Sequence, residues 1–368
     1  MSLLTIFLCG DVVLGRGIDQ ILPYPLVPSL REAFVQDARV YVRLAEKVNG
    51  PIPYPVDFSW PWGEALPTLD ELAPDVRLIN LETSITVDGE FAPGKAVHYR
   101  MNPANLPCLT VARPDGCALA NNHVLDFGDQ GLTDTLDALA RAGLQGAGAG
   151  QNANQAQSPA VVTVQDGRRV VFLSGGMESS GIPRRWAATA SRPGVFFIPD
   201  LSNRSAAEIA TPVQALKRPG DIAIVSLHWG SNWGYDISAG QVRFAHRLID
   251  AGADIVHGHS SHHPRPVEIY RNKLILYGCG DTINDYEGIK GYEAYRPDLR
   301  LLYLASVDSD SGALAALHMV PMQARNLQLR QASSTDTEWL RSTLEHASRH
   351  YGTRIDRDSD GTLTLLLT

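Results

Sequence analysis

The stretch "DIVHGHSSHHPRP" (residues 254–266) places four histidines within seven positions, from His257 to His263, directly after a short apolar run. A run of this kind is typical of a strand that is buried on both faces. Imidazole groups at the end of such a strand are suitable ligands for a divalent metal. The stretch therefore indicates a metal site at the edge of a sheet, and that site needs further ligands from elsewhere in the chain.

Short apolar runs recur along the chain, and helical patterns separate several of them. The runs lie at 3–11, 76–83, 116–123, 168–176, 221–230, 253–261 and 273–281, and the helical patterns at 62–74, 129–143 and 240–253. This alternation predicts a mainly parallel α/β sheet. A β-hairpin that turns at 308–312, a helix near 336–350 and a short last strand are expected to follow, and the proline-rich segments 22–60 and 177–200 are expected to be long loops or lids.

Six of the apolar runs end in side chains that can bind a metal. In an open α/β sheet, ligands lie beyond the carboxyl ends of the strands. Carboxylate, amide and imidazole groups together suit Mn²⁺, Zn²⁺, Fe²⁺ or Mg²⁺, and we therefore expect one or two divalent ions as cofactors. The residues concerned are Asp11, Glu82, Asn121 to His123, His228, His257 to His263, and Asp281.

The composition is that of an ordinary globular protein. The 368 residues are 44% hydrophobic and carry a net charge of -8 without a basic block, which argues against nucleic acid as a partner. The N-terminus lacks the pattern of a signal peptide, and no window reaches the roughly 18 apolar residues that a membrane span needs. These features predict a cytoplasmic chain without a membrane anchor.

Five motifs, in this order, resemble the CapA family, the poly-γ-glutamate capsule synthesis proteins, within the calcineurin-like metallophosphoesterase superfamily. They are "CGD" (9–11), "NLET" (80–83), "ANNHVLDFG" (120–128), "LHWG" (227–230) and "HGHSSHHPRPVEIY" (257–270). The resemblance implies a four-layer α/β/β/α sandwich with a metal site at the carboxyl ends of the strands. Residues 1–330 would form this domain, and a C-terminal helix and strand (331–368) would pack on it.

The resemblance also implies a set of metal ligands. Asp11 and His262 would hold the first ion, Glu82 would bridge, and the second ion would be held by Asn122, His228 and His259. Two positions depart from the superfamily pattern. Val13 stands where a histidine is usual, and the last motif reads Gly258-His259-Ser260-Ser261-His262 instead of G-H-x-H. The first ion is therefore expected to be short of ligands and weakly bound.

Catalytic and substrate-binding roles are expected for further residues of these motifs. His123 would be the proton donor and Asp126 could orient it, although an Asp at such a position is often a helix cap. His263 is a third catalytic candidate, with a supporting or structural role as the alternative for it and for His257. The candidate substrate-binding residues, some of which could instead be core or turn residues, are Arg16, Arg100, Trp229, Trp233 and Asp281.

The resulting functional hypothesis is a metal-dependent enzyme that acts on a peptide or a poly-γ-glutamate-like polyanion. Amide hydrolysis is the main interpretation, with the ion polarising a carbonyl or activating water. One alternative is a peptide epimerase that uses the same site, because a metal-bound amide carbonyl acidifies the adjacent Cα–H. The other alternative is a polymer-binding accessory protein of capsule synthesis without catalysis.

Overall fold

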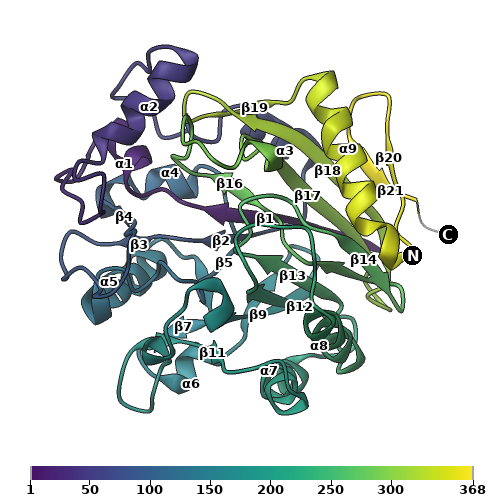
Figure 1. Cartoon of the computed structure of the whole chain (residues 1–368). Helices are drawn as coiled ribbons and strands as arrows, with labels where there is room; N and C mark the ends of the chain where they lie inside the picture. The colour runs from purple at the N-terminus through teal and green to yellow at the C-terminus, as the bar shows by residue number, and fades with distance from the viewer. Residues whose placement is uncertain (1, 367–368) are drawn as a thin grey trace.

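Two β-sheets packed face to face form the centre of the molecule, as Figure 1 shows for residues 2–366, which the computed structural model describes. The larger sheet has ten strands in the order β20-β21-β18-β17-β1-β2-β5-β6, with β16 beside β1 and β19 beside β18. Its strands are β1 (Leu3–Val12), β2 (Val76–Leu81), β5 (Gly116–Ala118), β6 (Gln145–Ala147), β16 (Asp281–Ile283), β17 (Leu299–Asp308), β18 (Leu314–Ala324), β19 (Leu329–Gln331), β20 (Ile355–Arg357) and β21 (Leu363–Leu365).

The smaller sheet has seven strands in the order β11-β9-β12-β13-β15-β14, with β8 beside β9. Its strands are β8 (Ala160–Thr163), β9 (Arg169–Met177), β11 (Phe197–Ile198), β12 (Ile222–His228), β13 (Ile255–His259), β14 (Val267–Tyr270) and β15 (Lys273–Leu276). Two short pairs, β3 (Ser84–Ile85) with β4 (Arg100–Met101) and β7 (Ala149–Gly150) with β10 (Gly194–Val195), lie outside both sheets.

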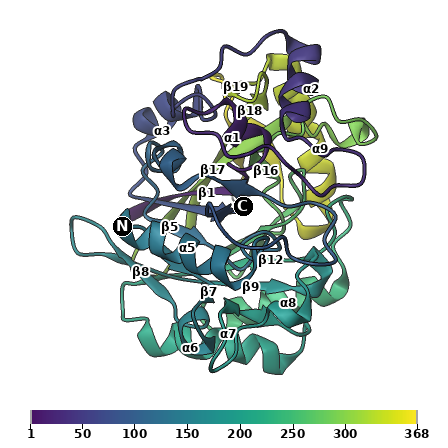
Figure 2. The same cartoon turned by 90° about the vertical axis from the view of Figure 1, so that its left-hand side faces the viewer.

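Helices cover the outer faces of the two sheets. The outer face of the seven-stranded sheet packs on α7 and α8, at the bottom of Figures 1 and 2. The outer face of the ten-stranded sheet packs on α1 to α5. The helices are α1 (Gly17–Ile21), α2 (Arg39–Asn49), α3 (Ala65–Leu72), α4 (Pro107–Thr110), α5 (Gly128–Arg141), α6 (Ala153–Ala156), α7 (Asn203–Leu216), α8 (Ala239–Asp250) and α9 (Ser334–Ser348).

The alternation of side chains along central strands explains this layering. On β1, Ile6 and Leu8 belong to the core between the sheets, whereas Phe7 and Cys9 face the helix-side core. Successive side chains of a strand point to opposite faces, so a continuous apolar run lets a strand bury both faces. The α/β/β/α sandwich expected from the resemblance is confirmed.

The C-terminal helix α9, yellow at the right of Figure 1, packs against the core between the sheets. Leu340 and Leu344 are both 1% exposed within that core. The Ser348 hydroxyl accepts a hydrogen bond from the backbone N–H of Val267 on β14, at 3.0 Å. The helix therefore contributes to the same core as the strands of both sheets.

Several local features differ from the sequence-based expectation. Segment 22–60, expected to be a loop, contains α2, whose residues Tyr41, Val42 and Ala45 are buried, and α7 was not anticipated. The run 273–281 is two strands, β15 and β16, because the chain leaves the smaller sheet after Leu276 and pairs with β1 in the larger sheet from Asp281. The larger sheet is mixed, since β17 to β21 pair antiparallel.

Strand β1 changes its neighbour along its length. Residues 3–8 pair antiparallel with β17, whereas Asp11 and Val12 pair in parallel with β16. The register of β1 also shifts against β2 between Leu8 and Asp11. Where a strand changes its neighbour, a crevice opens beyond the ends of the strands. Ligands bind at such points in α/β sheets. Asp11 stands at this opening.

Candidate metal centre

Two groups of potential metal ligands meet at Asp11. Atoms of Asp11, His228 and His259 lie within 4.8 Å of one another, and so do atoms of Asp11, His262 and Asp281. These side chains come from the carboxyl ends of β1, β12 and β13, from the turn after β13 and from the start of β16. The strand ends that the sequence indicated thus converge on one place.

The histidines of β12 and β13 stand side by side. His228 and His259 are partners in the parallel ladder, and their Nδ1 atoms are 2.7 Å apart. The second nitrogen of His228, Nε2, is 2.8 Å from Asn122 Oδ1. The second nitrogen of His259, Nε2, is 2.9 Å from the hydroxyl of Ser226, which fixes the orientation of that ring. Burial holds the pKa of both histidines well below the ordinary range, so both rings are neutral and able to ligate.

The carboxylates of the centre are buried and incompletely hydrogen-bonded. Asp11 is 0% and Glu82 2% exposed, and Asp11 Oδ2 and Glu82 Oε2 have no hydrogen-bond partner among the residues that the structure describes. Asn80 donates to Asp11 Oδ1 at 2.7 Å, and Glu82 Oε1 is 3.6 Å from His228 Nε2. Burial raises the pKa of Asp11 and of Glu82, and further carboxylates close by add to both shifts. Buried, unpartnered carboxylate oxygens beside neutral imidazoles fit a divalent cation, which would neutralise them.

His123 and Asp126 form a hydrogen-bonded pair beside this cluster. His123 Nδ1 is 2.6 Å from Asp126 Oδ2, and His123 Nε2 is 3.9 Å from Glu82 Oε1. Burial acts to raise the pKa of Asp126, but His123 and Lys95 outweigh it and hold that pKa below its usual value. Lys95 Nζ is 2.6 Å from Asp126 Oδ1, and the same ammonium group is 3.3 Å from His123 Nδ1. Burial lowers the pKa of His123 to about 4, so the three residues form a network of one ammonium group, one carboxylate and one neutral imidazole.

A cleft of about 320 Å³ opens onto the cluster. Its walls include Glu82, Asn122, His123, His228 and His262, together with residues that the sequence did not single out. The latter are Lys95, Tyr99, Asn232 and Tyr286. Lys95 and Tyr99 lie in irregular or short elements between β3 and β4, where no periodic pattern signals burial.

The other expected site residues differ in their distance from the cleft. Trp233 stacks on Tyr292, with ring centroids 4.0 Å apart, and lies 5.3 Å from the His262 ring, beside the centre. Trp229 is 1% exposed in the core and donates to the Tyr277 carbonyl at 3.1 Å. Its ring therefore has no surface free for substrate in this structure.

Arg16, Arg100 and His263 do not line the cleft, although Arg16 lies behind two of its lining residues, 4.9 Å from the Tyr99 ring and 5.7 Å from the Tyr286 ring. Arg16 is buried and pairs with Glu32 and Asp285, so its charged donors serve the fold. Arg100 stacks over Phe127 at 4.4 Å. His263 is 0% exposed, and its Nδ1 is 3.0 Å from the Pro264 carbonyl. Of the three catalytic candidates, His123 and Asp126 thus lie at the candidate metal centre, whereas the buried ring of His263 packs against the ring of Trp233.

The chain belongs to the family described as "Bacterial capsule synthesis protein PGA_cap", whose model matches residues 5–286. This is the CapA family, which belongs to the metallophosphoesterase superfamily. The chain is 60% identical over 366 residues, 99% of its length and 96% of the relative's, to a probable polyglutamine synthesis accessory protein of Mycobacterium tuberculosis. It is 31% identical over 213 residues to the PGA biosynthesis protein CapA of Bacillus subtilis, covering 56% of this chain and 52% of that protein.

Among solved structures, the protein TT1561 of Thermus thermophilus aligns with a TM-score of 0.37 at 9% identity, over 85% of this chain and 97% of that one.

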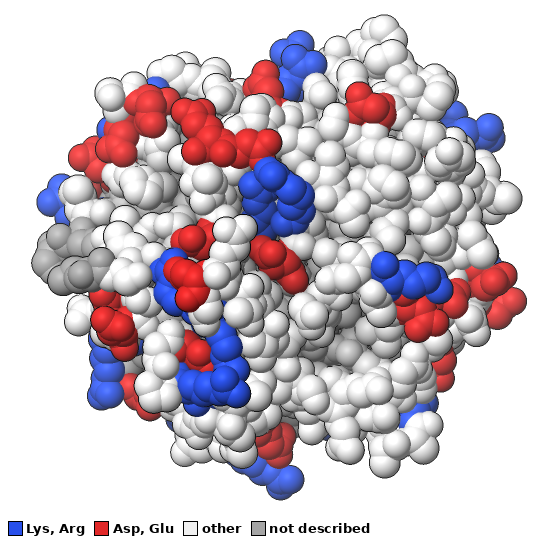
Figure 3. Space-filling model, turned by 180° about the vertical axis from the view of Figure 1, so that it is seen from behind, with Lys and Arg blue, Asp and Glu red and all other residues white. Residues whose placement is uncertain are grey.

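Within residues 2–366, none of the helices combines the length and the apolar composition needed to cross a bilayer. On the face seen in Figure 3, basic and acidic side chains lie interspersed over a largely uncharged surface.

Proposed function

We propose that this chain is a metal-dependent enzyme that binds a γ-glutamyl or related peptide chain in the cleft and acts on an amide group. The observation that carries the proposal is the sharing of Asp11 by two groups of potential ligands, next to the His123–Asp126 pair. Buried charges without partners are costly, and a site that accepts divalent ions explains why the fold retains them.

In this proposal, one ion is held by Asn122, His228 and His259 and the other by His262, with Asp11 and Glu82 available to both. The donor set accommodates Mn²⁺, Zn²⁺, Fe²⁺ or Mg²⁺. Bound there, divalent ions supply a Lewis acid for a carbonyl oxygen or lower the pKa of a water molecule.

His123 moves the proton in this scheme. Its Nδ1 is held by Asp126, which leaves Nε2 directed toward Glu82 and the cleft. An imidazole oriented by a buried carboxylate is a suitable general acid or base. Lys95 lines the cleft, where its ammonium group, paired with Asp126, is also available to a substrate carboxylate. Trp233 and Tyr292 offer an apolar surface beside His262.

The family supports the proposed substrate class. Two relatives carry names that refer to the synthesis of polyglutamine or of PGA, which supports a glutamyl chain as the ligand. The chain itself has a net charge of -8, so attraction of a polyanion would depend on the ions and on Lys95. We also propose a cytoplasmic location and no nucleic-acid partner; cell fractionation and nucleic-acid binding assays test these two points.

Two alternatives have specific support. The word "accessory" in the name of the mycobacterial relative favours a polymer-binding role without catalysis. The position of His123 beside the proposed ions also suits abstraction of a Cα proton next to a polarised amide carbonyl, which would epimerise a residue of a peptide.

One experiment separates these functions. The metal content of the purified chain is measured, and poly-γ-glutamate oligomers and model peptides are then incubated with it in heavy water and analysed by mass spectrometry. Hydrolysis shortens the chains, whereas epimerisation leaves their length unchanged and introduces deuterium at Cα. We expect shortening that requires metal and is lost in His123→Ala. Unchanged substrates that still bind would support the accessory role, and a chain that takes up no metal would contradict the proposal.

A further inference from the structure

Asp281 on β16 lies opposite Asp11 on the neighbouring strand β1. The two residues are Cα partners in the parallel ladder, although they lie near opposite ends of the sequence that the family model matches. Atoms of Asp281, Asp11 and His262 lie within 4.8 Å of one another. We infer that Asp281 is a metal ligand of the first ion, in place of the histidine that is absent at Val13; this inference rests on the proposed metal centre.

The surroundings of Asp281 hold it in position for this role. Asn284 donates to Asp281 Oδ2 at 2.7 Å, and the amide oxygen of Asn284 accepts from Arg300 Nη2 at 3.0 Å. Asp281 Oδ1 is 2.9 Å from His262 Nδ1. Ligating carboxylates are commonly hydrogen-bonded from behind in this way, which fixes their orientation toward the ion.

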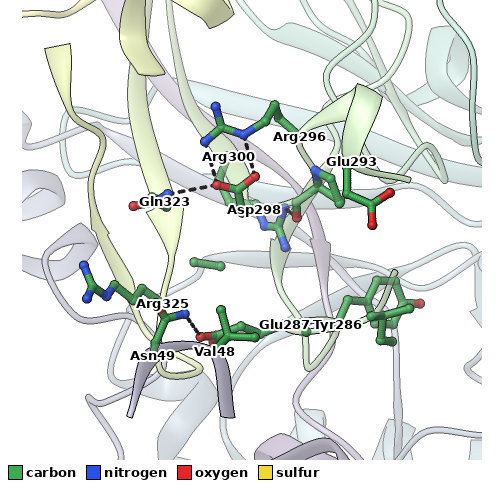
Figure 4. A pocket seen from close by; sticks show the side chains of 14 residues that line it. Val48, Asn49, Tyr286, Glu287, Glu293, Arg296, Asp298, Arg300, Gln323 and Arg325 are labelled. Atoms are coloured by element: carbon green, nitrogen blue, oxygen red, sulfur yellow. Dashed lines mark hydrogen bonds and ion pairs between the residues drawn. The ribbon is translucent and has the colours of Figure 1, made fainter. Parts of the chain in front are cut away.

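Arg300 connects this arrangement to a second cavity. It is 1% exposed and, with Tyr286, lines a cavity of about 330 Å³, drawn in Figure 4. In Figure 4 the carboxylate of Asp298 is engaged by Arg296, to which it is bound at 2.8 Å. The side chain of Arg300 donates to backbone carbonyls and to Asn284, and Asn284 in turn donates to Asp281, so Arg300 holds the amide group that orients the Asp281 carboxylate.

Local backbone geometry explains how His262 reaches the same place. Two residues, Ser260 and Ser261, separate it from His259, and Ser260 has a φ of 95°, a region that favours glycine. Such a conformation is costly for a residue with a side chain and is found where the surrounding structure enforces it. The turn brings the ring of His262 to Asp281. A hydrogen bond of 3.0 Å from the backbone N–H of His262 to the Asn232 carbonyl holds the turn in this position.

The two ligand groups differ in chemistry as a result. The group of Asp11, His262 and Asp281 has two carboxylates and one imidazole, whereas the group of Asp11, His228 and His259 has two imidazoles and one carboxylate. Carboxylates favour hard ions such as Mn²⁺ and Mg²⁺, and imidazoles favour Zn²⁺. The first ion is therefore not short of ligands, and it should show the stronger preference for Mn²⁺ over Zn²⁺.

Titration of the full chain with Mn²⁺ tests the inference. Wild type should show two binding events, and Asp281→Asn should lose one of them or weaken it at least tenfold. Asp298→Asn is the matched control, because it removes a carboxylate near Arg300 but outside both ligand groups; it should retain both events. Asn284→Ala, which leaves the carboxylate in place, should weaken the same event by a smaller factor.

The structure of the wild-type chain with Mn²⁺ bound provides a test that does not depend on how the variants fold. Anomalous scattering should place an ion within bonding distance of an Asp281 oxygen. An ion held by Asp11 and His262 while Asp281 contacts only His262 would overturn the inference, as would two unchanged binding events in Asp281→Asn. A wild-type chain that binds no metal would instead refute the proposed function and the inference with it.

Discussion

His257 joins the two sheets: its Nε2 on β13 donates a hydrogen bond to the backbone carbonyl of Cys9 on β1, at 2.8 Å. Its Nδ1 is 3.0 Å from the hydroxyl of Ser226. The ring is 1% exposed, so these two bonds replace the water that it loses on folding. One of the four clustered histidines thus holds β1 beside β13 at the base of the candidate centre.

Replacing His257 by Ala should therefore destabilise the fold. The Cys9 carbonyl would stay buried without its partner, which costs about 1–3 kcal/mol, and the lost ring volume adds to this. Urea unfolding measures the change. His257→Gln, which keeps a donor, is the control and should recover part of the loss. An unchanged unfolding free energy in His257→Ala would contradict the role.

His228→Ala and His259→Ala should each abolish the binding of one ion. Both rings lie at the ends of strands and belong to none of the three hydrophobic core clusters of residues 2–366. We therefore expect little change in the circular dichroism spectrum. Elemental analysis after dialysis measures the bound metal. Full metal content in either variant would show that the ligand assignment is wrong.

Metal should stabilise the folded chain. An ion that binds only the native state at a free concentration of 100 times its Kd stabilises by about 2.7 kcal/mol. Thermal unfolding with and without Mn²⁺ should show a higher Tm with the ion, and EDTA should reverse the shift. In Asp11→Asn, which alters the residue shared by both groups, the shift should be small or absent.

His123→Ala should reduce turnover without releasing metal. General acid–base catalysis commonly contributes about 10²–10⁴-fold, and we expect a loss of kcat in that range. Asp126→Asn should cause a smaller loss, since the imidazole stays but its Nδ1 partner is altered. The assay is the cleavage or exchange reaction identified by mass spectrometry, with metal content measured in parallel. Equal activity in wild type and His123→Ala would exclude His123 as the proton carrier.

Residues 331–368 should not be separable from the rest of the chain. Leu344 of α9 is 1% exposed in the core between the sheets, and Leu344→Ala should cost about 2–5 kcal/mol. Denaturant unfolding should show a single transition at a lower midpoint. Leu366→Ala, at a position that is 43% exposed, is the control and should change little. Two separate transitions would instead indicate an independent C-terminal unit.

The strands that carry the candidate centre could be predicted from sequence because a continuous apolar run followed by a polar residue is a local signal. Residues 3–11, 221–230 and 253–261 contain most or all of β1, β12 and β13. The helix α2 was missed because prolines on both sides of it suggested a loop, whereas packing of Tyr41 and Val42 stabilises it.

The site itself could be predicted only where its residues lie within motifs. The meeting of Asp11 with Asp281 depends on the chain crossing from one sheet to the other between β15 and β16, which no short-range pattern reports. The contact of Lys95 with Asp126 could not be predicted either, because Lys95 lies in an irregular segment without a periodic pattern. In contrast, the tryptophan of "LHWG" was a candidate for substrate contact with the core as its alternative, and the structure buries Trp229 in the core.

The change of neighbour along β1 has a consequence for how such chains can diverge. The register shift between Leu8 and Asp11 sets the face on which the carboxylate of Asp11 lies, and Val12 beyond it packs in the helix-side core. A further single-residue insertion carried through to Asp11 would turn this carboxylate to the helix side and remove it from both ligand groups at once. Segment 288–298, which lies outside the two sheets and is half-buried or exposed, is not tied to the register of β1, and loops of this kind accept insertions more readily than strands do. We therefore expect this segment to vary more readily than the spacing of the ligand residues.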